Sequence, residues 1–117
     1  MKYAEIQATV IQILQEQQGK YLLAYQIFKR IERENPTLAA QLLEAYPSEP
    51  GRPAMGKNAG IYYSAATFIA KALNHFKHSN PNIGKAFLTS EDIQNEEILA
   101  GDPKGLSIWA WTTPRTR

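Results

Sequence analysis

SAATFIAKALNHFKH, residues 64–78, carries the strongest helical pattern in the chain. Its apolar side chains recur at i, i+3, i+4, i+7, i+8 and i+11, at Ala65, Phe68, Ile69, Ala72, Leu73 and Phe76. This spacing places them on one stripe of an α-helix, so the stripe is predicted to face a core. Ser64 is a suitable N-cap residue. The stretch therefore predicts a helix that begins at Ser64 and buries one face.

The opposite side of the same helix is polar and free of acidic residues. Thr67, Lys71, Asn74 and His78 follow at i, i+4, i+7 and i+11, with the small residue Ala70 between them. A DNA-recognition helix uses such a mixture, because Asn can pair with adenine, Lys can bind guanine or phosphate, and small residues let the backbone approach. An ordinary solvated helix face has the same spacing, so both interpretations stay open.

The first half of the chain predicts three more helices. Apolar residues at helical spacing indicate a helix over about residues 2–18, ended by Gly19. A short extended connector over residues 20–22 leads into a second amphipathic helix that runs to about Glu34. Asn35 as N-cap and Pro36 at the first helical position then begin a third.

The C-terminal third predicts strands. GKAFLT (84–89) and LSIWAWTT (106–113) are rich in β-branched and aromatic residues, and a polar, acidic connection over roughly 90–105 joins them. The predicted fold is α+β and mainly α: about four helices and a C-terminal two-stranded β-hairpin, in one domain over 1–117. A chain of 117 residues is long enough for one such core.

GRPAMGKN, residues 51–58, has the glycine and lysine spacing of a phosphate-binding P-loop. The Mg²⁺-binding hydroxyl of that motif is replaced by Asn58, and the prolines before it exclude a central strand. Residues 47–60 hold three prolines and three glycines, which predicts a surface loop. Lys57 then becomes a cation on a loop next to the helix that begins at Ser64.

The net charge is only +2, but its distribution is uneven. No acidic residue lies between Glu49 and Glu91, whereas five basic residues do, which can gather into a cationic surface. The absence of cysteine excludes disulfides and thiolate metal sites. With an N-terminal segment unlike a signal peptide and no long apolar run, a cytoplasmic protein without a membrane span is expected.

The order of these elements resembles the winged helix-turn-helix superfamily. YLLAYQIFKRI (21–31) looks like the connector and second helix, YSAATFIAKALNHF (63–76) like the recognition helix, and the two predicted strands like the wing. Two features depart from the superfamily: an inserted helix and Pro/Gly-rich loop at about 35–63, and an acidic wing. The resemblance implies a DNA-binding, regulatory protein whose contact residues are Lys57, Thr67, Lys71, Asn74, Lys77 and His78, with Lys85, Arg115 and Arg117 as phosphate anchors.

The alternative is a winged-helix-like module that binds a protein, as an adapter, inhibitor or regulatory subunit. Its contact surface, to a protein partner or to a second copy in a homodimer, would be the 47–60 loop and the last strand, where Trp109 and Trp111 alternate with Ile108 and Ala110. Exposed tryptophans would mark an interface, whereas packing in the core is the default interpretation. An enzyme is not expected, since no catalytic constellation or cofactor fingerprint is present. His75 and His78 have no nearby carboxylate, which makes a poor metal site, so neither a metal nor a cofactor is predicted.

Overall fold

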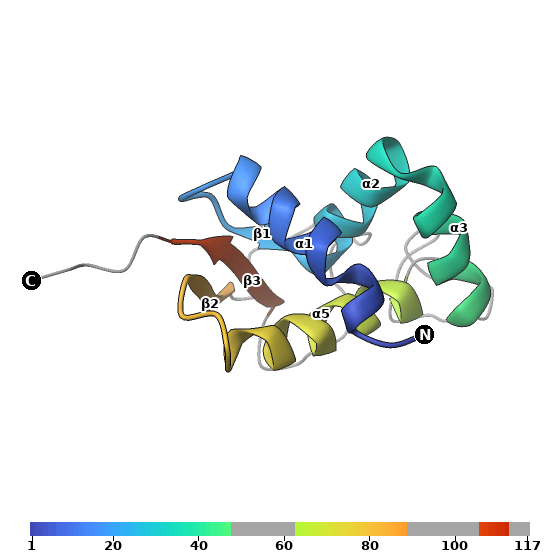
Figure 1. The fold of residues 1–117 in the computed structure, drawn as a ribbon. Coiled ribbons are helices and arrows are strands. Elements are labelled where there is room, and N and C mark those ends of the chain that lie inside the picture. Colours follow the sequence, from blue (N-terminus) through green and yellow to red (C-terminus); the bar gives the residue numbers. More distant parts are fainter. Residues whose placement is uncertain (48–62, 89–105, 113–117) are drawn as a thin grey trace, which may run out of the picture.

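The computed structural model describes residues 1–47, 63–88 and 106–112. Within these ranges the chain forms four helices and a small antiparallel sheet, which confirms the mainly α, α+β fold class (Figure 1). The elements are α1 (Ala4–Glu16), β1 (Leu22–Leu23), α2 (Ala24–Glu34), α3 (Pro36–Ala45), α5 (Tyr63–Lys77), β2 (Ile83–Leu88) and β3 (Leu106–Trp111). None of the described helices has the length and apolar content needed to cross a membrane.

The helix boundaries follow the capping chemistry that the sequence predicts, with two small differences. Asn35 caps α3, because its side-chain oxygen accepts a hydrogen bond from the Leu38 backbone N–H at 3.2 Å, and Pro36 occupies the first turn. The first helix is shorter than predicted, since residues at both ends form turns. Ser64 is not the N-cap, because α5 already includes Tyr63.

The sheet has three strands where a two-stranded hairpin was predicted. Its order is β1-β3-β2, and both pairings are antiparallel. Trp109 of the central strand β3 pairs with Leu22 of β1 at one edge and with Lys85 of β2 at the other. The third strand, β1, is only two residues long, and it overlaps the connector predicted over residues 20–22 at Leu22. A strand this short shows no periodicity, and its partner is distant in the sequence, so local patterning could not reveal it.

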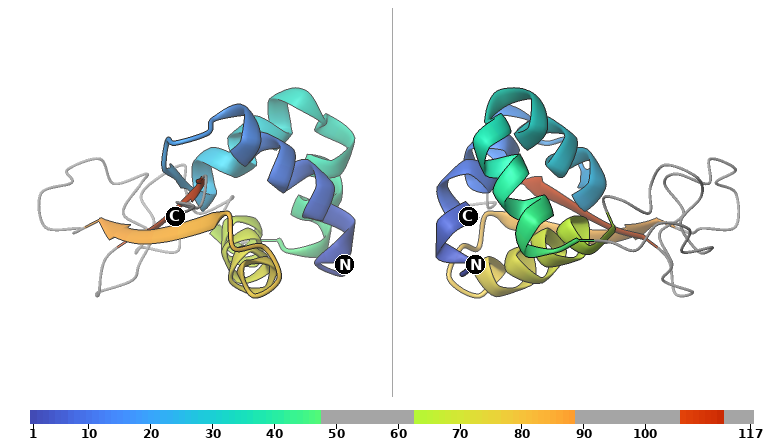
Figure 2. Two further views of the ribbon diagram at one scale, coloured as in Figure 1. Left: turned by 60° about the vertical axis from the view of Figure 1, so that its left-hand side comes forward. Right: turned by 90° about the vertical axis from the view of Figure 1, so that its right-hand side faces the viewer.

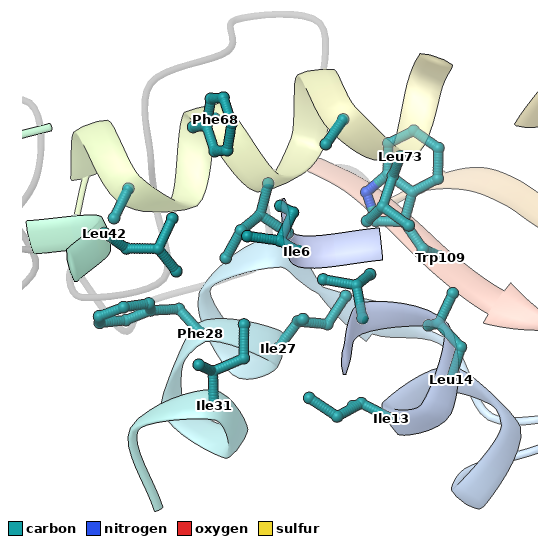
Figure 3. Packing of buried hydrophobic residues seen from close by; sticks show 14 of the residues in the cluster. Ile6, Ile13, Leu14, Ile27, Phe28, Ile31, Leu42, Phe68, Leu73 and Trp109 are labelled. Atoms are coloured by element: carbon teal, nitrogen blue, oxygen red, sulfur yellow. The ribbon is translucent and has the colours of Figure 1, made fainter. Parts of the chain in front are cut away.

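The core lies between the helices and the sheet. Aliphatic side chains from α1 and α2 meet the inner stripe of α5, and Trp109 enters from β3 (Figure 3). Trp109 is the largest of the fully buried side chains. At one end of this core, Tyr46 after α3 stacks on Phe68 with ring centroids 4.3 Å apart, and Tyr3 packs against the same ring at 5.2 Å. The core thus ties the N-terminus, α3 and α5 together.

Gly19 makes the turn that carries the chain from α1 to the sheet. Its φ of +82° lies in the left-handed region, and its N–H donates a hydrogen bond to the Trp111 carbonyl at 3.0 Å. No described atom lies within 4 Å of the position that a Cβ would take, so a side chain would meet no steric clash there. The positive φ is what makes a side chain unfavourable at this position. The position therefore favours glycine for its conformational freedom.

Replacing Gly19 with alanine is expected to lower the free energy of unfolding by about 1 kcal/mol, because a positive φ is unfavourable for a residue with a Cβ atom. Gly19→Asn is the control, since asparagine tolerates the left-handed region better and should lose less stability. Urea denaturation measures both. Equal stability of the alanine variant and the parent would contradict the assignment.

Candidate nucleic-acid interface

Helix α5 lies along one edge of the molecule. In Figure 1 it runs along the bottom, with α2 and most of α3 above it and the N-terminal end of α1 beside it. The left view of Figure 2 shows it nearly end-on. Its predicted apolar stripe is confirmed: Ala65, Phe68, Ile69, Ala72, Leu73 and Phe76 are all at most 8% exposed. One face of α5 therefore holds the helix to the core, and the opposite face is available to solvent.

The outer face carries the polar residues that the sequence places there. Lys71, Asn74 and His78 are exposed, and Thr67 is half-buried. At about 100° per residue, these four positions fall within an arc of roughly 60°. His78 lies one residue past the helix, in a turn where its N–H donates to the His75 carbonyl at 3.2 Å. The structure thus brings four of the predicted contact residues onto one surface.

Lys77 lies to one side of that surface. It is exposed, but six positions separate it from Lys71, which corresponds to a rotation of about 120° around the helix. Lys77 is therefore a flanking cation at the C-terminal end of α5. Lys57 and Arg115, together with Arg117, lie outside the described residues.

Strand β2 adds Lys85 to the outer face of α5. The Lys85 ammonium donates a hydrogen bond to the Asn74 side-chain oxygen at 3.0 Å, although eleven positions separate the two residues. The same ammonium lies 5.0 Å from the ring centroid of Phe87 and 5.0 Å from that of Trp109. Both distances suit cation–π attraction. The sequence predicted Lys85 only as a flanking anchor, whereas the structure joins it directly to Asn74.

This surface has no acidic residue of its own. Neither α5 nor β2 contains Asp or Glu. In the described part of the chain, the one ion pair joins Lys29 and Glu32 on α2, at 2.7 Å. No described carboxylate therefore neutralises Lys71, Lys77 or Lys85, so the described residues of this face carry positive charge and no negative charge.

Phe87 is a surface residue that the sequence analysis missed. It is 60% exposed, the largest value among the large apolar side chains that the structure describes. The pattern of GKAFLT held the signal, because Lys85 and Phe87 are two positions apart on a strand and so point to the same side of the sheet. An exposed aromatic ring therefore stands next to Lys85.

Trp109 packs in the core, which was the default interpretation, so it is not available for the predicted partner interface. Trp109 is 0% exposed and belongs to the core, and Trp111 is half-buried against it. The reason is the side of the sheet on which they lie. Trp111 pairs with Ile83 and Trp109 pairs with Lys85, and paired residues point to the same side, which here faces α5. Their apolar character serves core packing.

The described residues also contain no group of three or more His, Asp or Glu side chains placed to hold a metal ion. The candidate site is thus a helix face and one strand, with donors and cations but no carboxylate. Comparisons with protein-family models, with curated proteins and with solved structures found no match for this chain.

Proposed function

We propose that this protein binds duplex DNA by placing the outer face of α5 in the major groove. One observation carries the proposal: Lys71, Asn74 and His78 are exposed on the side of α5 away from the core, and Lys85 from β2 joins them through Asn74. These side chains can bind phosphates and base edges, and no acidic residue of α5 or β2 opposes them.

The dimensions of α5 suit this role. A helix with its side chains is about 10–12 Å across, and the major groove of B-DNA is about 12 Å wide. Fifteen residues give α5 a length of about 22 Å. Its position at the edge of the molecule leaves the outer face clear of α1, α2 and α3 (Figure 2). The half-buried Ala70 lies beside that face and offers little steric hindrance to the approach of the backbone.

Each side chain has a defined part in the proposal. Lys71 binds phosphate or guanine, Asn74 reaches a base edge, and Thr67 and His78 donate hydrogen bonds at the two ends of the contact. Lys77 and Lys85 flank them. The segments that carry Lys57 and Arg115 would add phosphate contacts. The order of helices and strands, which resembles the winged helix-turn-helix superfamily, supports this use of α5, and the proposed location is the cytoplasm.

Reversing the charge of Lys71 with Lys71→Glu is expected to weaken binding to duplex DNA at least tenfold at low salt, because one phosphate contact at about 50 mM salt contributes roughly tenfold. Fluorescence anisotropy with a labelled duplex over a salt series measures it. The plot of log K against log salt should lose about one unit of slope.

Arg33→Glu is the matched control. Arg33 is an exposed base in the last turn of α2. That end of α2 lies at the top of the molecule in Figures 1 and 2, away from α5. The variant has the same net charge as Lys71→Glu and should keep most of the affinity. Equal losses for both variants would mean that only net charge matters, and absence of any complex with the parent at micromolar concentration would reject the function.

A protein-binding module is the second candidate, and the exposed Phe87 favours it. An aromatic ring that is 60% exposed on a strand can anchor a protein partner. A pull-down from cell lysate, with and without nuclease, separates the two functions. A partner that survives nuclease treatment of the parent protein and is lost with Phe87→Ala would support this candidate.

A further inference from the structure

We propose that Asn74 and Lys85 act as one unit that selects guanine over adenine at the base pair facing the C-terminal part of α5. This inference rests on the proposed function, since it names what that surface would read. It depends on one contact, the hydrogen bond of 3.0 Å between the Lys85 ammonium and the Asn74 side-chain oxygen.

The contact fixes the direction of the Asn74 amide. An ammonium group only donates hydrogen bonds, so the oxygen of Asn74 must face Lys85. The amide nitrogen of Asn74, with its two N–H groups, then forms the other side of the side chain. The remaining lone pair of the oxygen lies beside a positive charge, which disfavours another donor there. The pair therefore presents hydrogen-bond donors: the Asn74 amide N–H groups and the remaining N–H groups of Lys85.

A surface of donors distinguishes the two purines. In the major groove, guanine presents two acceptors, N7 and O6, whereas adenine presents the acceptor N7 and the donor N6–H₂. An isolated asparagine, with one acceptor and one donor side, suits adenine. Because Lys85 occupies the acceptor side of Asn74, the pair suits the two acceptors of guanine. With adenine, its N–H groups would face the N6–H₂ donor and could not form that hydrogen bond.

Lys85 is held in place by the sheet. It lies directly opposite Trp109 in the register of β2 and β3, and its ammonium stands 5.0 Å from both the Trp109 and the Phe87 rings. These contacts restrict the flexible side chain before any ligand arrives, so less conformational entropy is lost on binding. The strand thus positions the ammonium at Asn74 rather than leaving it free in solvent.

Two variants separate the parts of this unit. Lys85→Met removes the ammonium but keeps an unbranched apolar chain over Trp109, and it releases the oxygen of Asn74. Asn74→Ala removes the amide and leaves Lys85. Lys77→Met is the matched control, because Lys77 is an exposed lysine on the flank of the same helix. Circular dichroism confirms that each variant keeps the fold before binding is measured.

The experiment starts with selection of bound sequences from a pool of randomised duplexes, using the full chain. In a selected duplex, each guanine is then replaced in turn by 7-deazaguanine, which lacks the N7 acceptor, or by inosine, which keeps both N7 and O6. We expect 7-deazaguanine at one position to weaken binding about tenfold and inosine at the same position to leave binding unchanged.

The variants supply the second half of the test. Lys85→Met should lose the sensitivity to 7-deazaguanine and should bind adenine at that position as well as guanine. Lys77→Met removes only a flanking cation, so it should bind every duplex more weakly but keep the parent's ratio between guanine and 7-deazaguanine. Selected sites without a guanine that depends on N7, or a Lys85→Met variant that keeps the sensitivity, would overturn the inference while DNA binding itself stands. If no duplex is bound at all, the proposed function fails and this inference fails with it.

Discussion

Replacing Ile69 with glutamate is expected to abolish the cooperative folding of this protein. Ile69 is 0% exposed in the middle of α5, where it belongs to the core that α5 shares with α1 and α2. No buried polar or charged residue accompanies it among the described residues, so a carboxylate there would have no partner. Burying an unpaired charge costs several kcal/mol, which is comparable to the total stability of about 5–15 kcal/mol of a small domain.

The control is the same change two residues further along the helix. Lys71 is exposed on the outer face, so Lys71→Glu should unfold at nearly the same temperature as the parent. Far-ultraviolet circular dichroism during heating measures both variants. A sigmoidal unfolding transition of parental size for Ile69→Glu would show that this face of α5 is not buried. Together the pair separates the structural side of α5 from the side proposed to bind DNA.

The second large effect is expected for Trp109→Ala, at about 3–5 kcal/mol of lost stability. Trp109 is the largest fully buried side chain, and its removal would leave a cavity between β3 and the helices. Its indole N–H finds no hydrogen-bond acceptor among the described residues. Trp109→Phe should therefore lose less than the alanine variant, because it keeps most of the ring and removes a buried donor that has no described acceptor.

Urea denaturation measures these losses, and the midpoint should fall while the slope stays constant. Phe87→Ala is the matched control, since it removes an aromatic ring that is 60% exposed from the neighbouring strand. It should cost less than about 1 kcal/mol. If Phe87→Ala were as destabilising as Trp109→Ala, the assignment of the two rings to surface and core would be wrong.

Periodicity within single segments was enough to predict the helices and the inner face of α5. The stripe from Ala65 to Phe76 repeats over three turns, and Asn35 with Pro36 marks a helix start through chemistry that acts within one turn. Such local signals do not depend on the rest of the chain. The polar residues opposite the stripe were identified by the same spacing, and the structure shows that Lys71, Asn74 and His78 are exposed.

Features that depend on distant partners could not be predicted. Strand β1 exists because Leu22 and Leu23 pair with β3, and nothing in two leucines identifies that partner. The sequence left open whether Trp109 lies in the core or at an interface, because alternation tells which residues share a side, not which side is covered. The contact between Lys85 and Asn74 arises where β2 crosses the end of α5, a position set by the packing of the whole domain.

The central position of β3 between β1 and β2 has a consequence for biosynthesis. The ribosome makes the chain from the N-terminus, so α1, α2 and α5 emerge before the strand that supplies Trp109. Until β3 emerges, β1 has no strand to pair with, and the apolar faces of the nascent helices cannot pack against Trp109, the largest buried side chain. Release of β3 from the exit tunnel is therefore expected to be the event that commits the nascent chain to its native state.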